Sequence, residues 1–352
     1  MKQSAKELLI ELLETPSPSG SEQPVQEIVR RYLGEFADEV RTDRHGNVIG
    51  CCNPGKPLRV LLAGHCDQIG LLISYIDENG FLRVQTIGGW DPQQLIGQRM
   101  VVWTKSGAVP GVIARKAIHL LTAEERKKVT ESKELWIDIG AASRDEAKEV
   151  VRIGDPVTLE LGYRELRGKF ATAPKMDNTT GLWTVLEALR RASEMGLNCS
   201  LYAASTVQEE IGLRGARTSA FGVDPQMGIA VDVTHATDCP TVSPDTEGEV
   251  KLGGGPVIFR GPNMSPIVSE ALIETAEEHE IEHQLAAIGR ATPNDANVLQ
   301  INRDGVATGL VSIPNRYMHS AVEMIHLDDI DRAAELIARY VGSLSGDEDF
   351  IP

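Results

Sequence analysis

The sequence predicts an α/β protein with one large three-layer α/β/α domain that carries a smaller β-rich domain as an insertion. Three observations lead to this fold class. Apolar segments of strand length alternate with amphipathic helical segments in both the first and the last part of the chain, which is typical of helices covering both faces of a sheet. Between residues 71 and 162 the pattern changes to short extended segments separated by turns. The length of 352 residues also exceeds that of a usual single domain.

The first 70 residues predict the start of the large domain. In PVQEIVRRYLGEF the apolar residues recur at helical spacing, which predicts a helix over 24–36. The segment DRHGNVIG follows as a polar turn with glycine between short extended pieces. The nearly continuous apolar run LRVLLAGH then fits a strand buried on both faces, as in a parallel or mixed sheet.

Residues 71–162 predict the inserted domain. Two hairpins are expected, one turning at Asn79-Gly80 and the other at Ser106-Gly107. Short charged helices are predicted over 122–131 and 143–151, and IGDPVTLEL predicts a closing strand. Such a segment indicates a small antiparallel barrel or sandwich, so that the large domain consists of residues 1–70 and 163–352.

Alternation of helices and strands returns after the insertion. The periodic segments predict helices and strands in the following order: helix 179–192, strands 200–207 and 227–233, helix 265–280, strand 305–313 and helix 328–341. The second of these helices opens with the Ser-Pro start signal of helix N-termini. These elements complete the three layers of the large domain.

Composition and charge exclude several classes of partner. The formal net charge of −16 opposes binding to nucleic acid, and no basic run with interleaved aromatic residues offsets it locally. No apolar run reaches membrane-spanning length, and the first residues lack a signal-peptide pattern, so a cytoplasmic protein without membrane contact is expected. The five cysteines form no C-x-x-C pair and are expected to be reduced.

Imidazole and carboxylate groups gather where the predicted strands end. Open α/β sheets bind ligands outside the carboxyl ends of their strands. The candidate residues at that edge follow four strands and one loop: His65 and Asp67, Asp177, Glu209 and Glu210, Asp232, and His319. Each is weak evidence alone, because aspartates often cap helices and a histidine beside an aspartate is common. Their joint placement predicts a binding site.

The spacing of these residues suits a hydrolytic metal site. His65 and Asp67 alternate on an extended backbone, so that the carboxylate can orient an imidazole that binds a metal. Glu209 and Glu210 diverge, so that one can bind a cation while the other holds a proton, although a solvated pair on a loop is the alternative. Two histidines with several carboxylates favour Zn²⁺, Co²⁺ or Mn²⁺ over Ca²⁺ or Mg²⁺.

Ten motifs occur in order along nearly the whole chain: DRHGNVIG, GHCDQIG, IGGWDPQQLIGQRM, HLLTAEERKK, WIDIGAASRDEA, RIGDPVTL, KMDNTTG, TVQEEIGLRGA, AVDVTHATD and IPNRYMHSAVE. By these motifs the sequence resembles the dinuclear metal aminopeptidases of the glutamyl or deblocking type, the tetrahedral aminopeptidases, some relatives of which were once named endoglucanases. The resemblance implies a metal-dependent aminopeptidase that removes amino-terminal residues from peptides.

The resemblance also implies a role for each candidate residue. The first of two divalent metal ions, Zn²⁺ or Co²⁺ with Mn²⁺ as an alternative, would be bound by His65, Asp177 and Asp232. The second would be bound by Asp177, Glu210 and His319, with Asp177 bridging. Glu209 would act as general base and Asp67 as an orienting residue. The insertion would be a PDZ-like dimerisation domain, and the dimers would build a dodecamer.

Two other readings remain open at this point. The same metals could serve a deacylase acting on small N-acyl substrates, or the glycanase activity for which some relatives were named, although a glycosidase requires a carboxylate pair and no imidazoles. A non-catalytic assembly protein that kept the fold is the third reading. Retention of Glu209 beside all the candidate ligands argues against that reading.

Overall fold

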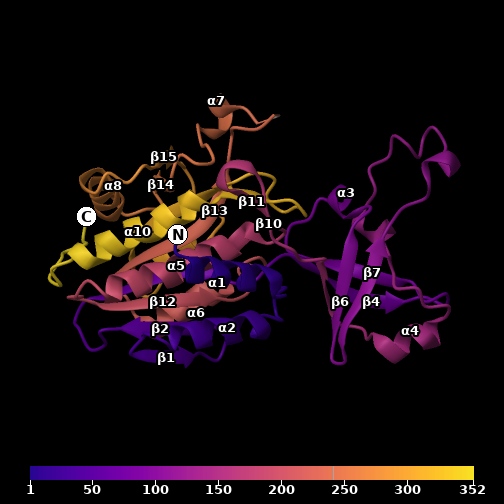
Figure 1. Cartoon of the computed structure of the whole chain (residues 1–352), viewed down its shortest axis with the longest axis horizontal. Coiled ribbons are helices and arrows are strands. Elements are labelled where there is room, and N and C mark those ends of the chain that lie inside the picture. Colours follow the sequence, from indigo (N-terminus) through magenta and orange to yellow (C-terminus); the bar gives the residue numbers. More distant parts are fainter. Residues whose placement is uncertain (241) are drawn as a thin grey trace.

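The computed structural model describes residues 1–240 and 242–352. The chain forms two parts, a sheet body and a closed barrel, which lie side by side in Figure 1. The predicted α/β class with a β-rich insertion is confirmed. None of the helices in these residues is long and apolar enough to cross a membrane.

The sheet body contains a mixed eight-stranded sheet in the order β1-β2-β12-β3-β13-β16-β14-β15. The four central strands run parallel, as predicted for apolar runs buried on both faces. They are β12 (Ser200–Thr206), β3 (Arg59–His65), β13 (Met227–His235) and β16 (Ala307–Asn315). The outer strands are β1 (Glu39–Thr42), β2 (Val48–Cys52), β14 (Val257–Arg260) and β15 (Gln284–Ala287). The carboxyl ends of the four central strands therefore meet at one edge.

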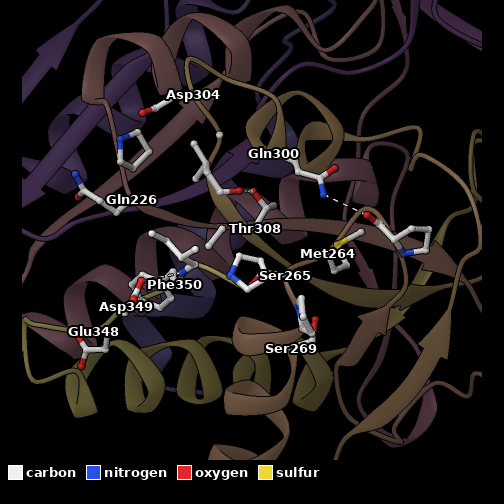
Figure 2. A pocket seen from close by; sticks show the side chains of 18 of the residues that line it. Gln226, Met264, Ser265, Ser269, Gln300, Asp304, Thr308, Glu348, Asp349 and Phe350 are labelled. Atoms are coloured by element: carbon white, nitrogen blue, oxygen red, sulfur yellow. Dashed lines mark hydrogen bonds between the residues drawn. The ribbon is translucent and has the colours of Figure 1, made fainter.

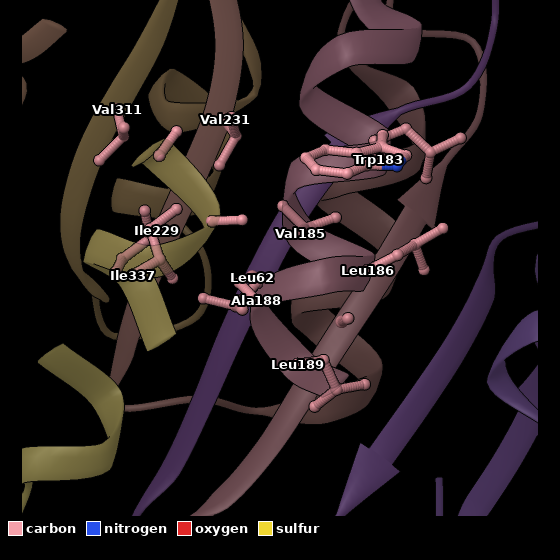
Figure 3. Close-up of a cluster of buried hydrophobic side chains, with 14 of the residues drawn as sticks. Leu62, Trp183, Val185, Leu186, Ala188, Leu189, Ile229, Val231, Val311 and Ile337 are labelled. Atoms are coloured by element: carbon pink, nitrogen blue, oxygen red, sulfur yellow. The ribbon is translucent and has the colours of Figure 1, made fainter. Parts of the chain in front are cut away.

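Helices cover both faces of this sheet. One face carries α1 (Gln3–Glu14), α2 (Gln23–Leu33), α5 (Met176–Ser193), α8 (Pro266–Glu278) and α10 (Leu327–Ser343), and the other carries α6 (Arg214–Val223) and α9 (Asp295–Gln300). Alternate residues of β3 supply the two cores: Val60 and Leu62 face α5, whereas Leu61 and Ala63 belong to the core under α6. Figure 3 shows the first core, where Trp183 on α5 is fully buried.

The inserted barrel has a core of its own. Its strands close in the order β4-β5-β8-β7-β6-β9. They are β4 (Gly70–Ile76), β5 (Leu82–Ile87), β6 (Arg99–Thr104), β7 (Gly107–Ile113), β8 (Ile137–Asp138) and β9 (Pro156–Leu159), with the short helices α3 (Pro92–Leu95) and α4 (Arg144–Val150). Leu71, Ile73, Leu82 and Val157 are completely buried in a cluster separate from those of the sheet body. Both predicted hairpins form.

The charged helix predicted over 122–131 does not form. Thr122 and Glu125 make the reciprocal hydrogen bonds of a capping box, but the chain turns only once. Short 3₁₀ turns at Ile118–Leu120 and Ser132–Glu134 flank it. Its side chains are mostly exposed, and a helix of this length needs an apolar face packed against a partner to be stable in water.

A three-stranded sheet joins the barrel to the sheet body. It consists of β10 (Arg164–Glu165), β11 (Phe170–Thr172) and β17 (Met324–His326), in that order. β11 leads from the barrel into α5, and β17 follows the loop after β16 and precedes α10. The short helix α7 (Pro244–Glu247) lies in the long connection between β13 and β14. The three-stranded sheet therefore pairs the chain before Asp177 with the chain after His319.

A cavity of about 1130 Å³ lies at the opposite edge of the large sheet. Gln226 and Thr308, at the amino ends of β13 and β16, line it together with Phe350 near the carboxyl terminus (Figure 2). None of the site residues that the sequence predicts lines this cavity. The candidate site therefore lies elsewhere, at the carboxyl edge.

Helix α5 lies close against β3 at two glycines. A Cβ atom on Gly64 would be 2.9 Å from main-chain atoms of Gly181, and a Cβ atom on Gly181 would be 2.6 Å from the main-chain carbonyl oxygen of Val231 on the neighbouring strand β13. These distances are below van der Waals contact, so glycine is needed for the close approach. Because Gly64 precedes His65 and α5 begins beside Asp177, the approach also brings two candidate ligands together.

Gly64→Ala is expected to lower the free energy of unfolding by roughly 1–3 kcal/mol, because the methyl group meets main-chain atoms that cannot rotate away. Urea unfolding followed by circular dichroism measures the change. Gly289→Ala is the matched control, since its added methyl group has no atom within 4 Å and should change stability by less than about 0.5 kcal/mol. Equal stability of the two variants would contradict the packing argument.

Candidate metal centre

The structure brings the residues that the sequence predicts together at the carboxyl edge of the central strands. His65 is the last residue of β3 and pairs in register with Thr206, the last residue of β12. The other residues lie on neighbouring elements: Glu209 and Glu210 on the loop after β12, Asp232 within β13, Asp177 at the start of α5, and His319 on the loop after β16. Parallel strands end at a common edge, which explains why residues distant in the sequence meet there.

Three carboxylates surround the imidazole of His65. Its Nε2 atom lies 3.2 Å from Oδ1 of Asp177, 3.7 Å from Oδ1 of Asp232 and 3.8 Å from Oε2 of Glu209. His65 is 1% exposed and all three carboxylates are buried. Ligand atoms of His65, Glu209 and Asp232 lie within 4.8 Å of one another, which is close enough to surround one metal ion.

Asp177 belongs to a second group of ligand atoms, since those of His65, Asp177 and Glu210 also lie within 4.8 Å of one another. Nε2 of His319 lies 3.2 Å from Oδ2 of Asp177 and 3.6 Å from Oε1 of Glu210. The two oxygens of Asp177 thus face different histidines, since Oδ1 is the one near His65. This is the arrangement that a carboxylate bridging two cations requires.

Main-chain carbonyl groups orient both imidazoles. Nδ1 of His65 lies 3.1 Å from the carbonyl oxygen of Asp67, and Nδ1 of His319 lies 2.7 Å from that of Gly89 in the barrel. Because a carbonyl oxygen only accepts hydrogen bonds, Nδ1 carries a proton in each ring, and in the neutral form of each ring Nε2 has a free lone pair. Each histidine can therefore offer Nε2 to a cation.

The carboxylate of Asp67 holds the loop of the two glutamates. The main-chain N–H of Glu209 donates to Oδ1 at 2.9 Å, that of Glu210 donates to Oδ2 at 3.2 Å, and the hydroxyl of Ser19 also donates to Oδ2. Oδ1 of the same carboxylate is 3.6 Å from Nδ1 of His65, whereas the main-chain carbonyl oxygen of Asp67 is closer, at 3.1 Å. Asp67 thus contacts His65 through its main chain and the glutamates through its side chain.

The site concentrates negative charge away from water. Burial raises the pKa of Glu209 and Glu210 well above the usual value, and a neighbouring carboxylate adds to the shift in each case. Burial alone would lower the pKa of both histidines, but the surrounding carboxylates raise it, to about 9 for His319. Burial would raise the pKa of Asp177, but hydrogen bonds with the two histidines hold it well below its usual value.

The donor set fits a divalent cation. Four carboxylates converge on two imidazoles, and burial makes their mutual repulsion costly unless positive charge is present. Oε1 of Glu210 is buried without a hydrogen-bond partner, although it lies 3.6 Å from Nε2 of His319. Since buried polar atoms are normally paired, this oxygen is free to contact a cation. Mixed nitrogen and oxygen donors of this kind suit Zn²⁺, Co²⁺ or Mn²⁺.

Sequence reasoning missed two groups at this site. Glu323 is 2% exposed and accepts hydrogen bonds from the main chains of both Asp177 and His319. The only signal for it was its position four residues after His319 in YMHSAVE. The carbonyl group of Gly89 has no side-chain signal at all, and it lies 230 positions before the histidine that it contacts.

Known proteins resemble this chain along nearly its whole length. Residues 46–336 match the family model described as M42 glutamyl aminopeptidase. A lysyl aminopeptidase of Pyrococcus furiosus is 40% identical over 336 residues, which are 94% of each chain. The solved TET aminopeptidase of a marine sediment archaeon (Thaumarchaeota archaeon) is 35% identical with a TM-score of 0.92, covering 97% of this chain and 96% of that one. The Pyrococcus horikoshii TET1 peptidase, which can assemble into a tetrahedron or a large octahedral shell, is 33% identical with a TM-score of 0.86, covering 97% and 100%.

Proposed function

Since the chain belongs to the M42 glutamyl aminopeptidase family and is a peptide hydrolase, we propose that it removes amino-terminal residues from peptides with two divalent cations. The observation that carries this proposal is the position of Asp177 between His65 and His319, 3.2 Å from Nε2 of each. One shared carboxylate between two imidazoles is the geometry expected for two adjacent metal sites.

The proposed ligands divide into two sets that share Asp177. The first cation would be held by His65, Asp177 and Asp232, and the second by Asp177, Glu210 and His319. Cations of this kind lower the pKa of a water molecule and stabilise the charge that develops on a carbonyl oxygen during hydrolysis. Zn²⁺ or Co²⁺ fits this donor set, and Mn²⁺ is the alternative.

We propose that Glu209 is the general base and that the carboxylate of Asp67 holds the loop that carries it. Glu209 is buried and its carboxylate lies 3.8 Å from Nε2 of His65, at the edge of the first ligand set. Burial raises the pKa of Glu209, which makes its ionised carboxylate a stronger base: it can take a proton from water and, once protonated, give that proton to the leaving amine. The hydrogen bond from its main chain to Asp67 fixes the loop and leaves the side chain free for this task.

Recognition of the free α-amine would restrict cleavage to the first residue of a peptide. A small cavity of about 10 Å³ beside the centre is lined by Asp177, Glu210 and His319 together with Trp90, Lys175 and Glu323. The carboxylates at this cavity would attract a protonated α-amino group and disfavour a neutral acylated one. Peptides with a free amino terminus are therefore the proposed substrates.

We also propose that residues 71–162, which form nearly all of the barrel, are a dimerisation domain, that residues 1–70 and 163–352 form the catalytic domain, and that dimers build a dodecamer. The separate core of the barrel supports an independent domain. Ile118, Leu120 and Val129 on its long loop are each more than half exposed, which is typical of apolar side chains that a partner covers. The shells formed by the TET1 peptidase make a second copy of this chain the natural partner.

The protein is expected to release p-nitroaniline from lysyl, glutamyl or leucyl p-nitroanilide, to lose this activity with a chelator and to regain it with Co²⁺ or Zn²⁺. The N-acetylated form of each substrate is the control and should not be cleaved, whereas release of acetate from it would favour the deacylase. Metal-loaded protein that cleaves no substrate would refute the proposed function and favour the assembly protein.

Light scattering of the same sample should give the mass of twelve 38.3 kDa chains.

A further inference from the structure

Glu323 is a buried carboxylate that connects the two segments carrying Asp177 and His319. Its Oε2 atom accepts the main-chain N–H of Asp177 at 2.8 Å, and its Oε1 atom accepts that of His319 at 2.7 Å. Its main-chain carbonyl also accepts the N–H of Ala173 at 3.1 Å. Burial and the nearby carboxylate of Asp177 raise the pKa of Glu323 to about 8, and its two oxygens together accept one N–H group from each segment. This side chain therefore fixes one segment relative to the other.

Both segments have backbone conformations that require such support. Lys175, two residues before Asp177, has φ of 79°, and Tyr317 and His319 have φ of 63° and 59°. These values lie in the left-handed region, which is unfavourable for residues other than glycine and persists only where the surroundings enforce it. Glu323 contacts both segments next to these residues, and it can therefore determine where their side chains point.

Asp67 makes the same kind of contact on the other side of the centre. Each of the two carboxylates accepts two main-chain N–H groups from ligand-bearing segments: Asp67 from Glu209 and Glu210, and Glu323 from Asp177 and His319. Because both oxygens of Glu323 are directed to N–H groups, its geometry suits a positioning residue better than a metal ligand.

We propose that Glu323 is a positioning residue that sets the distance between Asp177 and His319 and thereby the affinity of the centre for its second divalent cation. The inference rests on the proposed function, because it assumes that Asp177 and His319 bind a cation. Residues that orient metal ligands typically change metal affinity or activity by 10–100-fold when they are replaced.

Glu323→Gln tests the proposal, because glutamine keeps the shape but can accept only one of the two N–H groups with its carbonyl oxygen. Titration of the chelator-treated protein with Co²⁺, followed by the visible absorption of the bound ion, should show the weaker binding step shifted by 10–100-fold. At saturating Co²⁺, kcat should fall while KM stays within about twofold. Should this variant fail to fold, Glu323→Asp keeps the charge, cannot reach both N–H groups, and should show the same shift.

Asp329→Asn is the matched control. Its carboxylate is completely buried and accepts the main-chain N–H groups of Gly253 and Gly255, on a loop that carries no candidate ligand. Both variants should lower the melting temperature, but only the change at Glu323 should weaken Co²⁺ binding. Unchanged Co²⁺ affinity in the folded Glu323 variants would refute the positioning role. Wild-type protein that binds Co²⁺ at one site or none would instead refute the proposed dinuclear centre.

Discussion

Glu209→Gln should keep its bound cations and lose turnover by two to four orders of magnitude. General acid–base catalysis by one side chain is worth about that factor, and glutamine can neither take nor give the proton. The fold of the loop should survive, because it is the main-chain N–H of Glu209 that Asp67 holds, 2.9 Å from Oδ1. The measurements are kcat/KM with an aminoacyl p-nitroanilide and the metal content of the purified variant.

Glu210→Gln is the matched control for this experiment. It changes the adjacent residue in the same way, and its main-chain N–H is held by the same carboxylate of Asp67 at 3.2 Å. This control should lose metal affinity and recover activity in part when excess Co²⁺ is added. The comparison is informative because Glu209 also lies near His65 and Asp232, within reach of a common cation. If Glu209→Gln lost its metal as well, Glu209 would be a ligand and its role as base would be refuted.

Asp177→Asn should reduce kcat/KM by roughly a thousandfold or more and weaken the binding of both cations. A catalytic metal ion contributes several kcal/mol, and each 1.36 kcal/mol is a factor of ten in rate. The side-chain oxygen of asparagine can face one histidine, but its amide nitrogen then faces Nε2 of the other. An amide nitrogen has no lone pair to offer a metal. The loss should therefore exceed that of Glu210→Gln, which removes a ligand of one cation only.

Elemental analysis of the Asp177 variant, after dialysis against a low concentration of Zn²⁺, measures the metal that remains bound. Asp304→Asn is the control, because Asp304 is exposed and lines the cavity at the opposite edge of the sheet. It should retain wild-type metal content and activity. A variant at Asp177 that still bound two ions per chain would contradict the bridging role proposed for this carboxylate.

Much of the fold was predictable because its signals are local. The apolar run that ends at His65 indicates a strand buried on both faces whatever surrounds it, and the glycine turns of residues 71–162 indicate hairpins. Strand ends then place the candidate residues, because parallel strands finish at a common edge. For this reason the sequence alone predicts that His65, Asp232 and His319 lie close together.

Other features depend on contacts between segments that are distant in the sequence, and local sequence patterns do not predict such contacts. Glu323 looks like an ordinary loop glutamate until β11 and β17 pair and bring Asp177 beside it. The helix predicted over 122–131 has favourable residues and a capping box, yet its side chains are mostly exposed. Propensity alone does not hold so short a helix in water.

The point of insertion of the barrel has a consequence for how this protein can be altered. The barrel begins five residues after His65 and returns through β10 and β11 to Asp177, and Gly89 accepts the Nδ1–H of His319 from within it. A shortened chain, with a tight turn in place of the barrel, would keep every proposed metal ligand and still lose the group that fixes the tautomer of one of them. The barrel is thus not an exchangeable cassette, and grafting it from a relative would have to preserve the path of the chain at Gly89.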